Sequence, residues 1–332
     1  MKKVPHSLVC LTLIFTGALL FSFCIGKYPV SPAELAGALW AKARGAKLSG
    51  ALEAVIFHVR LPRVLAAALV GAALAAAGTA YQCLFNNPLV SPDVLGASAG
   101  AGFGAALGIL RGASYAGISV SAFAFGLAPV IAALAVSSRS RANPTLALVL
   151  AGIMAGSLFS AATSYLKLIA DPTNALPAIT YWLMGSLAGV RLRDLTFAIL
   201  PVGTGLAVLF LCRWQLNIMT QGEDEARALG INTRAVRVAV VAGATLASAA
   251  CVSISGMIGW VGLVVPHFAR SFTGQDNRAA LPAAMLLGAS FLLVVDTAAR
   301  TIAAHEVPIG ILTAFVGAPF FVYLILQRGN RT

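Results

Sequence analysis

Long stretches without charge recur along the chain and are separated by short polar segments. A bilayer core of about 30 Å takes about 20 apolar helical residues, and a spanning helix satisfies its own backbone hydrogen bonds. Six charge-free windows in the first two thirds of the sequence meet this condition and predict six transmembrane helices: residues 8–25, 64–85, 94–110, 115–136, 145–166 and 195–212.

The last third opens with an uncharged stretch, residues 238–269, that is too long for one ordinary span. Ser255, Gly256 and Gly259 interrupt it. We therefore predict a full helix to about Ser255 and a short one from about residue 258, which crosses only part of the bilayer. Two more charge-free windows bring the predicted number of spans to ten: residues 279–299 and 308–326.

One further uncharged window, residues 172–190, is left out of this count. It contains two prolines and Asn174, and Asp171 directly precedes it. These features favour a short, partly exposed helix. Because ten is an even number, both termini lie on one side, and Lys2 and Lys3 before the first span predict that this side is cytoplasmic.

Composition fits an all-α polytopic membrane protein, which we expect to form one transmembrane domain over residues 1–332. Apolar residues make up 59% of the chain and charged ones 10%, against about half and a quarter in soluble proteins, which excludes a soluble enzyme. The net charge of +12 does not indicate a nucleic-acid partner, because on the predicted topology 12 Lys and Arg are cytoplasmic and 11 lie outside. The five cysteines contain no CxxC pair, so we expect neither a disulfide framework nor a thiolate metal site.

Small residues recur at helical spacing in the third predicted span. They form a stripe of four glycines, which predicts close helix packing because small residues let helices in lipid approach each other: Gly96, Gly100, Gly104 and Gly108. Gly152 and Gly156 repeat the pattern in the fifth span.

Ionisable residues inside the predicted spans are few. Asp296 is the nearest exception, and His267 is a lone histidine beside Pro266. An ion-coupled secondary carrier would want intramembrane carboxylates, so it remains only the alternative hypothesis. An intramembrane hydrolase using Ser255 and His267 is disfavoured, because no third residue is placed to orient the histidine.

A polar insert, residues 214–236, separates the sixth and seventh spans. Glu223, Asp224 and Glu225 suit the first turn of a helix, and Gly230 suits its end. Asn232 and Thr233 can cap a second short helix that carries Arg234 and Arg237. The pattern is equally compatible with a compact docking knob on the cytoplasmic face and with an ordinary solvated loop. The chain has no GxxxxGK[ST] phosphate loop, so ATP-driven transport would need another polypeptide.

Five ordered motifs, which together cover nearly the whole chain, resemble the FecCD-type permeases of bacterial ABC importers for iron siderophores, haem and vitamin B12. They are RLPR (60–63), NPLVSPDVLG (87–96), the insert segment 222–230, GWVGLVVPHFAR (259–270), and VPIG (307–310) with GAP (317–319).

The resemblance implies a type II ABC importer permease fold in the bacterial inner membrane. It implies a permease dimer that binds no cofactor itself. Two separate ATPase subunits hold ATP and Mg²⁺, and a soluble binding protein delivers the cargo. By resemblance, the outer-face arginines that receive this protein are Arg60, Arg63 and Arg300. The coupling helix that contacts the ATPase comprises Gly222, Glu223, Ala226, Leu229 and Gly230.

The same resemblance places the cytoplasmic gate at Asn143, Thr145 and Leu146. The fifth span would line the pathway with Ser157, Ser160 and Ser164, although these hydroxyls can instead bond carbonyls one turn back. No metal site is expected in the chain, because the candidate pathway has no acidic ring or Met cluster. An intact metal chelate therefore fits better as cargo than a bare ion, and an oxyanion such as molybdate stays open.

Overall fold

The computed structural model describes residues 4–45, 50–140 and 143–329, and every regular element in them is a helix. Seven of these helices are long and apolar enough to cross a membrane, and two shorter apolar ones, α5 and α15, join them. With the short α13, they account for the ten predicted spans. The spans are α1 (Val4–Cys24), α4 (Leu61–Leu84), α5 (Ala97–Leu110), α6 (Tyr115–Arg139), α7 (Pro144–Ile169), α9 (Leu192–Leu211), α12 (Thr233–Ser255), α13 (Val261–Thr273), α14 (Asn277–Ala299) and α15 (Ile309–Gly329).

The predicted break in the long uncharged stretch is confirmed. α12 ends at Ser255, and Gly256 and Trp260 both have positive φ, 69° and 70°. α13 then runs for 13 residues, which at 1.5 Å per residue is about 20 Å and less than the thickness of a bilayer core. The excluded window 172–190 contains only α8 (Ala175–Leu183), a nine-residue helix, as predicted.

The segment before the second span is more helical than the charge pattern predicts. α2 (Pro32–Ala43) begins with a capping box, in which Ser31 accepts from the Glu34 N–H and Glu34 accepts from the Ser31 N–H. α3 (Gly50–Glu53) and the π-helix η1 (Ala54–Arg60) then run without a break into α4. The prediction that this helix starts at residue 64 is wrong, because Arg60 and Arg63 end the charge-free window without ending the helix, which continues through Pro62 directly after the π-helix.

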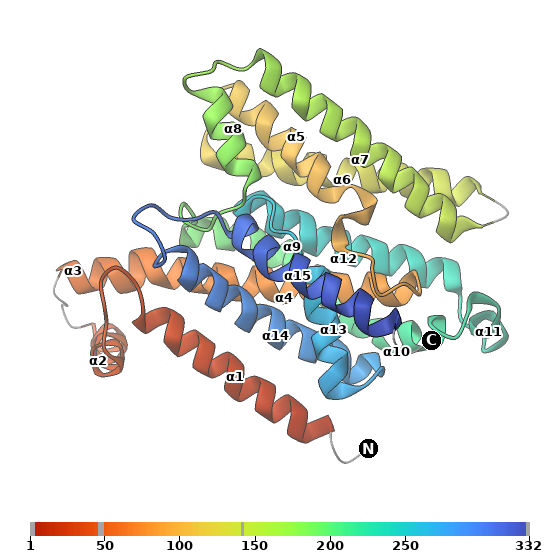
Figure 1. Ribbon diagram of the computed structural model, residues 1–332, viewed down its shortest axis with the longest axis horizontal. Coiled ribbons are helices and arrows are strands. Elements are labelled where there is room, and N and C mark those ends of the chain that lie inside the picture. Colours follow the sequence, from red (N-terminus) through yellow and green to blue (C-terminus); the bar gives the residue numbers. More distant parts are fainter. Residues whose placement is uncertain (1–3, 46–49, 141–142, 330–332) are drawn as a thin grey trace.

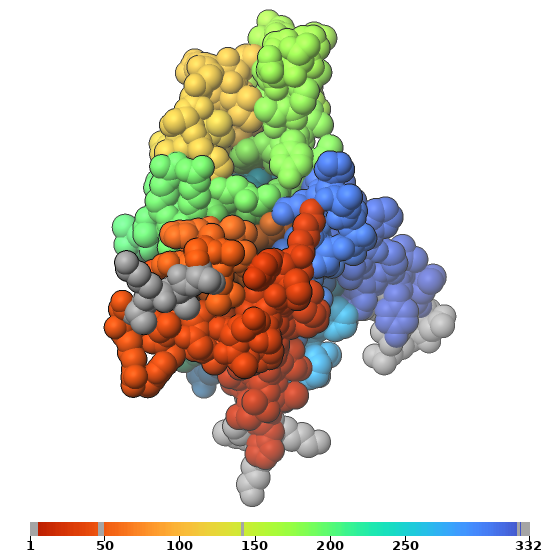
Figure 2. Space-filling view, turned by 90° about the vertical axis from the view of Figure 1, so that its left-hand side faces the viewer, coloured from red at the N-terminus to blue at the C-terminus, as the bar shows by residue number. Residues whose placement is uncertain are grey.

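Three helices form the centre of the bundle. α4 and α12 pack against each other, α14 packs against α4, and all three are largely buried. α1 lies along one edge on α14, and α5, α6 and α7 pack together on the opposite side (Figure 1). Figure 2 shows α5 to α8 rising as a lobe above the rest of the molecule.

The predicted glycine seam lies between α5 and α6. A Cβ added at Gly100 or Gly104 would collide with the backbone carbonyl of Phe125 or Ser121 on α6, and one at Gly108 would contact Ile118. Gly96 is the N-cap of α5 and so lies outside the helical stripe, but it does pack closely, against Gly152 and Gly156 of α7. It follows the 3-10 helix η2 (Pro92–Leu95) and adopts a left-handed conformation with φ 81°, which glycine reaches at no steric cost.

The helices have two distinct ends. α10 (Arg213–Met219) and α11 (Glu223–Ala228) lie at the end where α1 begins and α15 finishes, which we call the insert end (Figure 1). α2 and α3 lie at the opposite end, together with the basic residues Arg60, Arg63 and Arg300; we call it the arginine end. Lys2 and Lys3, which predict the side of the first terminus, lie outside the described residues.

Candidate functional site

The polar insert folds into short helices, but not quite as predicted. α11 starts at Glu223 after Gly222 and ends in a Schellman motif, in which the N–H of Ile231 donates to the Ala226 carbonyl at 3.0 Å. Gly230 supplies the left-handed residue of this motif, with φ 81°. The expected second short helix is wrong, because Asn232 caps α12 itself, which continues without Gly or Pro at its start.

Glu223 connects the insert to the start of α7. Its Oε1 accepts from Thr145 Oγ1 at 2.9 Å and from the guanidinium of Arg237, and its Oε2 accepts from Arg227 Nη2 at 2.9 Å. Arg237 is 5% exposed, and its pairing with Glu223 ties α11 to α12. One carboxylate therefore holds together the predicted coupling helix, the predicted gate and a central span.

The charge of Glu223 is stabilised by this arrangement. Partial burial disfavours its ionised form, but the hydrogen bonds from Arg237 and Thr145 and the charges of Arg237 and Arg227 outweigh it. The pKa of Glu223 is therefore held below its ordinary value of 4.5. At neutral pH the carboxylate is ionised and accepts all three contacts.

Of the other predicted coupling and gate residues, some are buried in the protein and others are exposed on its surface. Ala226 is fully buried beneath α11, whereas Leu229 is 68% exposed at its end. Asn143 caps α7 by accepting from the Leu146 N–H at 2.9 Å, and the Leu146 side chain is exposed. An exposed apolar tip on a buried base is suited to docking; the role of each residue in coupling stays a prediction.

The arginine end contains a buried ionic cluster. Arg63 Nε donates to both oxygens of Asp296, at 2.8 and 3.1 Å, and its Nη1 donates to both oxygens of Glu306, at 2.8 and 2.9 Å. The Asp296 side chain is fully buried and the Arg63 side chain is 7% exposed. The cluster joins the start of α4 to the end of α14 and to the segment before α15.

The two other predicted docking arginines also face inward. Arg60 donates to the carbonyls of Phe23, Cys24 and Tyr28, and Arg300 donates to the carbonyl and the hydroxyl of Ser22. All three arginines are less than a tenth exposed. The expectation that they offer exposed charges to a partner is wrong, because buried acceptors in this chain already use them; whether they support docking in another way stays a prediction.

The serines of the predicted pathway lie on the outward face of α7. Ser157, Ser160 and Ser164 are all exposed in this single chain. Ser157 donates to the Ile153 carbonyl at 2.9 Å and Ser164 to the Ser160 carbonyl at 3.0 Å, one turn back in each case. The alternative interpretation of these hydroxyls therefore holds for two of the three, and their role in a pathway stays a prediction.

A large apolar hollow lies between the end of α8, the break after α12 and the helix α15. Its volume is about 720 Å³, and Met184, Met257, Trp260 and Phe315 are among the side chains that line it. None of its described lining residues carries a charge. The two methionines are far apart in the sequence, and the hollow forms where the break after α12 meets the start of α15. Here the Gly310 N–H donates to the Met184 carbonyl at 3.1 Å.

The described part of the chain contains no group of three or more His, Cys, Asp or Glu residues that could hold a metal ion. The expectation that the chain binds no metal or cofactor itself stays a prediction. Sequence analysis missed two features of the ionic sites. The first is that Glu306 belongs to the cluster around Arg63, and the second is that Glu223 contacts Thr145. A lone Glu306 just before the last span was the available signal for the first; nothing in the sequence indicated the second.

Comparison with known proteins identifies this arrangement. A model of the FecCD transport family matches residues 12–327. The chain belongs to the FecCD transport family. As a FecCD permease, it is the membrane subunit of an ABC importer rather than an enzyme, it works with ATPase and substrate-binding subunits, and its helices make it a multi-pass membrane protein.

Relatives of this FecCD permease cover most of its length. It is 39% identical over 328 residues to the molybdate import system permease protein MolB of Haemophilus influenzae, a match that covers 98% of this chain and 97% of the relative. It is 40% identical over 278 residues to a probable iron chelatin transport system permease protein of Helicobacter pylori, covering 83% of each.

The fold of the permease is also found among solved structures. A structure assigned to a metal-chelate type ABC transporter in an inward-facing conformation matches with a TM-score of 0.88 and 37% identity, over 97% of this chain and 99% of that one. The predicted type II ABC importer permease fold is thereby confirmed.

Proposed function

We propose that this permease carries an intact metal chelate, such as a ferric siderophore, haem or cobalamin, from a soluble binding protein to the cytoplasm. The apolar hollow of about 720 Å³ beside α15 carries this proposal. Its uncharged lining suits a bulky ligand whose metal is already wrapped by its chelator. A bare cation would need convergent oxygen, nitrogen or sulfur ligands.

A molybdate-type oxyanion is the second candidate cargo. The relative from Haemophilus influenzae that matches 98% of this chain is a molybdate permease, and a relative of similar identity is a probable iron chelatin permease. Cargo therefore varies within this range of identity. The lining of the hollow argues against an oxyanion cargo, because it offers no positive charge to compensate the two negative charges of molybdate.

The proposed assembly is a homodimer of this chain with two ATPase subunits at the insert end and the binding protein at the arginine end. Both termini are then cytoplasmic. The outward face of α7, with large exposed side chains such as Leu158 and Leu168, is available to the second copy or to lipid. Leu229 on α11 would enter the ATPase, and Glu223 would pass its movement to Thr145 at the gate.

Uptake by the purified complex tests the proposed function. The permease is reconstituted in proteoliposomes with its ATPase and its binding protein, and labelled ferric chelate, cobalamin and molybdate are offered separately. We expect ATP-dependent accumulation of a chelate and none of molybdate. Accumulation of molybdate alone would establish the second candidate, and accumulation that persists without the ATPase would contradict both in favour of an ion-coupled carrier.

A further inference from the structure

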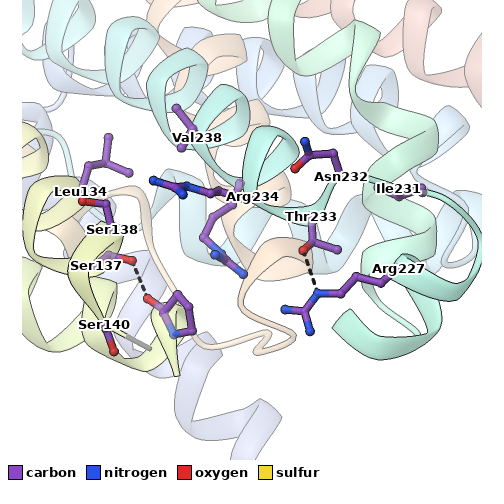
Figure 3. A pocket seen from close by; sticks show the side chains of 12 residues that line it. Leu134, Ser137, Ser138, Ser140, Arg227, Ile231, Asn232, Thr233, Arg234 and Val238 are labelled. Carbon is purple, nitrogen blue, oxygen red and sulfur yellow. Dashed lines mark hydrogen bonds between the residues drawn. The ribbon is translucent and has the colours of Figure 1, made fainter. Parts of the chain in front are cut away.

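A basic pocket opens at the insert end beside the Glu223 junction. Its volume is about 370 Å³, and it lies between the C-terminal turn of α6 and the first turns of α12. Figure 3 shows Ser137, Ser138 and Ser140 on one wall, facing Arg227 and Arg234 across the open space.

The pocket has more positive charge than its surroundings neutralise. It is lined by Arg227, Arg234 and Arg237, and none of its described lining residues is acidic. The nearby carboxylates Glu223 and Asp224 pair with Arg227, and Glu223 also pairs with Arg237. Three guanidinium groups thus meet two carboxylates, and Arg234 has no ion pair with any residue that the structure describes.

One buried donor in the pocket wall lacks an acceptor. Arg237 is 5% exposed, and its Nε has no hydrogen-bond partner among the described residues. A buried donor without an acceptor is costly, and it leaves the guanidinium charge of Arg237 only partly compensated. The N-terminus of α12, a 23-residue helix capped by Asn232, reaches the same pocket and adds the positive end of its dipole.

The pocket lies where the hydrocarbon layer of the membrane is expected to begin, and this position indicates which ligand it can bind. Arg237 is followed by a charge-free stretch from Val238 to residue 269, so the hydrocarbon layer begins just beyond the arginines. Leu134 and Val238 form an apolar part of the same wall. Cations beside apolar side chains at this depth match the phosphate and the first acyl carbons of a phospholipid.

We propose that this pocket binds the phosphate of an anionic phospholipid headgroup. The hydroxyls at the end of α6 and the guanidinium groups of α11 and α12 would then hold one ligand from two sides. The lipid would strengthen the connection between the α6–α7 turn and the insert. That consequence for coupling rests on the proposed function, whereas lipid binding does not.

Native mass spectrometry of the full chain in detergent tests the site. The probes are phosphatidylglycerol, phosphatidylcholine with the same acyl chains, and inorganic phosphate. We expect preferential binding of phosphatidylglycerol that millimolar phosphate does not displace. Arg234→Ala should weaken it about five-fold, the effect of about one surface charge, and Arg234→Glu roughly 25-fold. Arg278→Ala, which removes an exposed charge at the same end but outside the pocket, is the matched control.

Three results would overturn the proposal. Equal losses in the Arg234 and Arg278 variants would show that binding reflects overall charge and not this pocket. If inorganic phosphate displaced phosphatidylglycerol at equal concentration, the ligand of the pocket would be a free anion and not a lipid. Unchanged lipid binding by Arg234→Ala, together with loss of the ATPase subunit on copurification, would assign the pocket to an acidic protein segment. Because none of these measurements involves uptake, they do not depend on the cargo.

Discussion

Thr145 Oγ1 donates to Glu223 Oε1 at 2.9 Å across 78 residues of sequence. This bond joins the first turn of α7, which contains Thr145 and Leu146 of the predicted gate, to the first residue of α11, the predicted coupling helix. Arg237 of α12 shares the same carboxylate oxygen. Movement of α11 therefore has a direct polar connection to both helices, and no intervening loop has to transmit it.

Removing the hydroxyl should uncouple the permease without unfolding it. A hydrogen bond to a charged group contributes about 1.5–3 kcal/mol, so Thr145→Val should lower the uptake per ATP hydrolysed by about ten-fold or more. The ratio is measured in proteoliposomes that contain the full complex. Thr204→Val, whose hydroxyl bonds the Leu200 carbonyl of its own helix, is the control. An unchanged ratio would remove Thr145 from the coupling route.

The junction should respond to acid. Because the pKa of Glu223 is lowered in the folded protein, the stability that it contributes is complete above its ordinary value of 4.5 and is lost as the pH falls through the lower folded value. Amide exchange in α11 should therefore be slow and constant between pH 5 and 8, after correction for intrinsic rates, and should accelerate below about pH 4. Glu223→Gln should abolish this acid step; its persistence in the variant would point to another carboxyl group.

Leu229 should contribute to contact with the ATPase and little to folding. Its side chain is 68% exposed, so Leu229→Asp should leave the melting temperature of the isolated permease within about a degree. Copurification of the ATPase, or stimulation of its activity by the loaded binding protein, should fall at least ten-fold. Ala226→Asp, which places a charge at a fully buried position, should instead unfold α11. Normal coupling in Leu229→Asp would make the insert an ordinary loop.

Loss of Arg63 should destabilise the fold. It would leave Asp296, whose side chain is fully buried, without its main cation, and breaking one partner of a buried pair costs about 3–5 kcal/mol. Arg63→Ala should lower the thermal midpoint in detergent, and Arg63→Ala with Asp296→Asn should recover part of the loss. Arg193→Ala, at a side chain 64% exposed, serves as control. A stable Arg63→Ala that loses only binding-protein affinity would restore the docking interpretation.

The glycine seam should tolerate no side chain where α5 meets α6. In Gly104→Ala, the added Cβ would collide with the Ser121 carbonyl and the Phe125 side chain, and overpacking of this kind costs about 1–3 kcal/mol. Gly203→Ala is the matched control, since a Cβ there meets nothing within 4 Å. Thermal unfolding of the two variants measures the difference. Equal stability would show that the seam is loosely packed.

Prediction from sequence worked where one helix sets its own boundaries. The charge-free windows located the ten spans because the bilayer requires continuous apolar helices, and the glycines after Ser255 marked the end of α12. Prediction from sequence failed where packing against another helix determines the backbone conformation. Gly96 lies at helical spacing from Gly100, yet it is left-handed because η2 must turn there to meet Gly152 and Gly156 of α7.

By itself, the sequence determined the class of the protein, its helices and, through five motifs, its resemblance to a permease family. Those properties depend on hydropathy, helix ends and local residue order. Only the tertiary structure decided that Arg63 meets Asp296 and Glu306, that Thr145 meets Glu223, and that Arg234 stands in an open pocket. Charge pairing acts over a few ångströms in space, and in this bundle the partners are up to 243 residues apart.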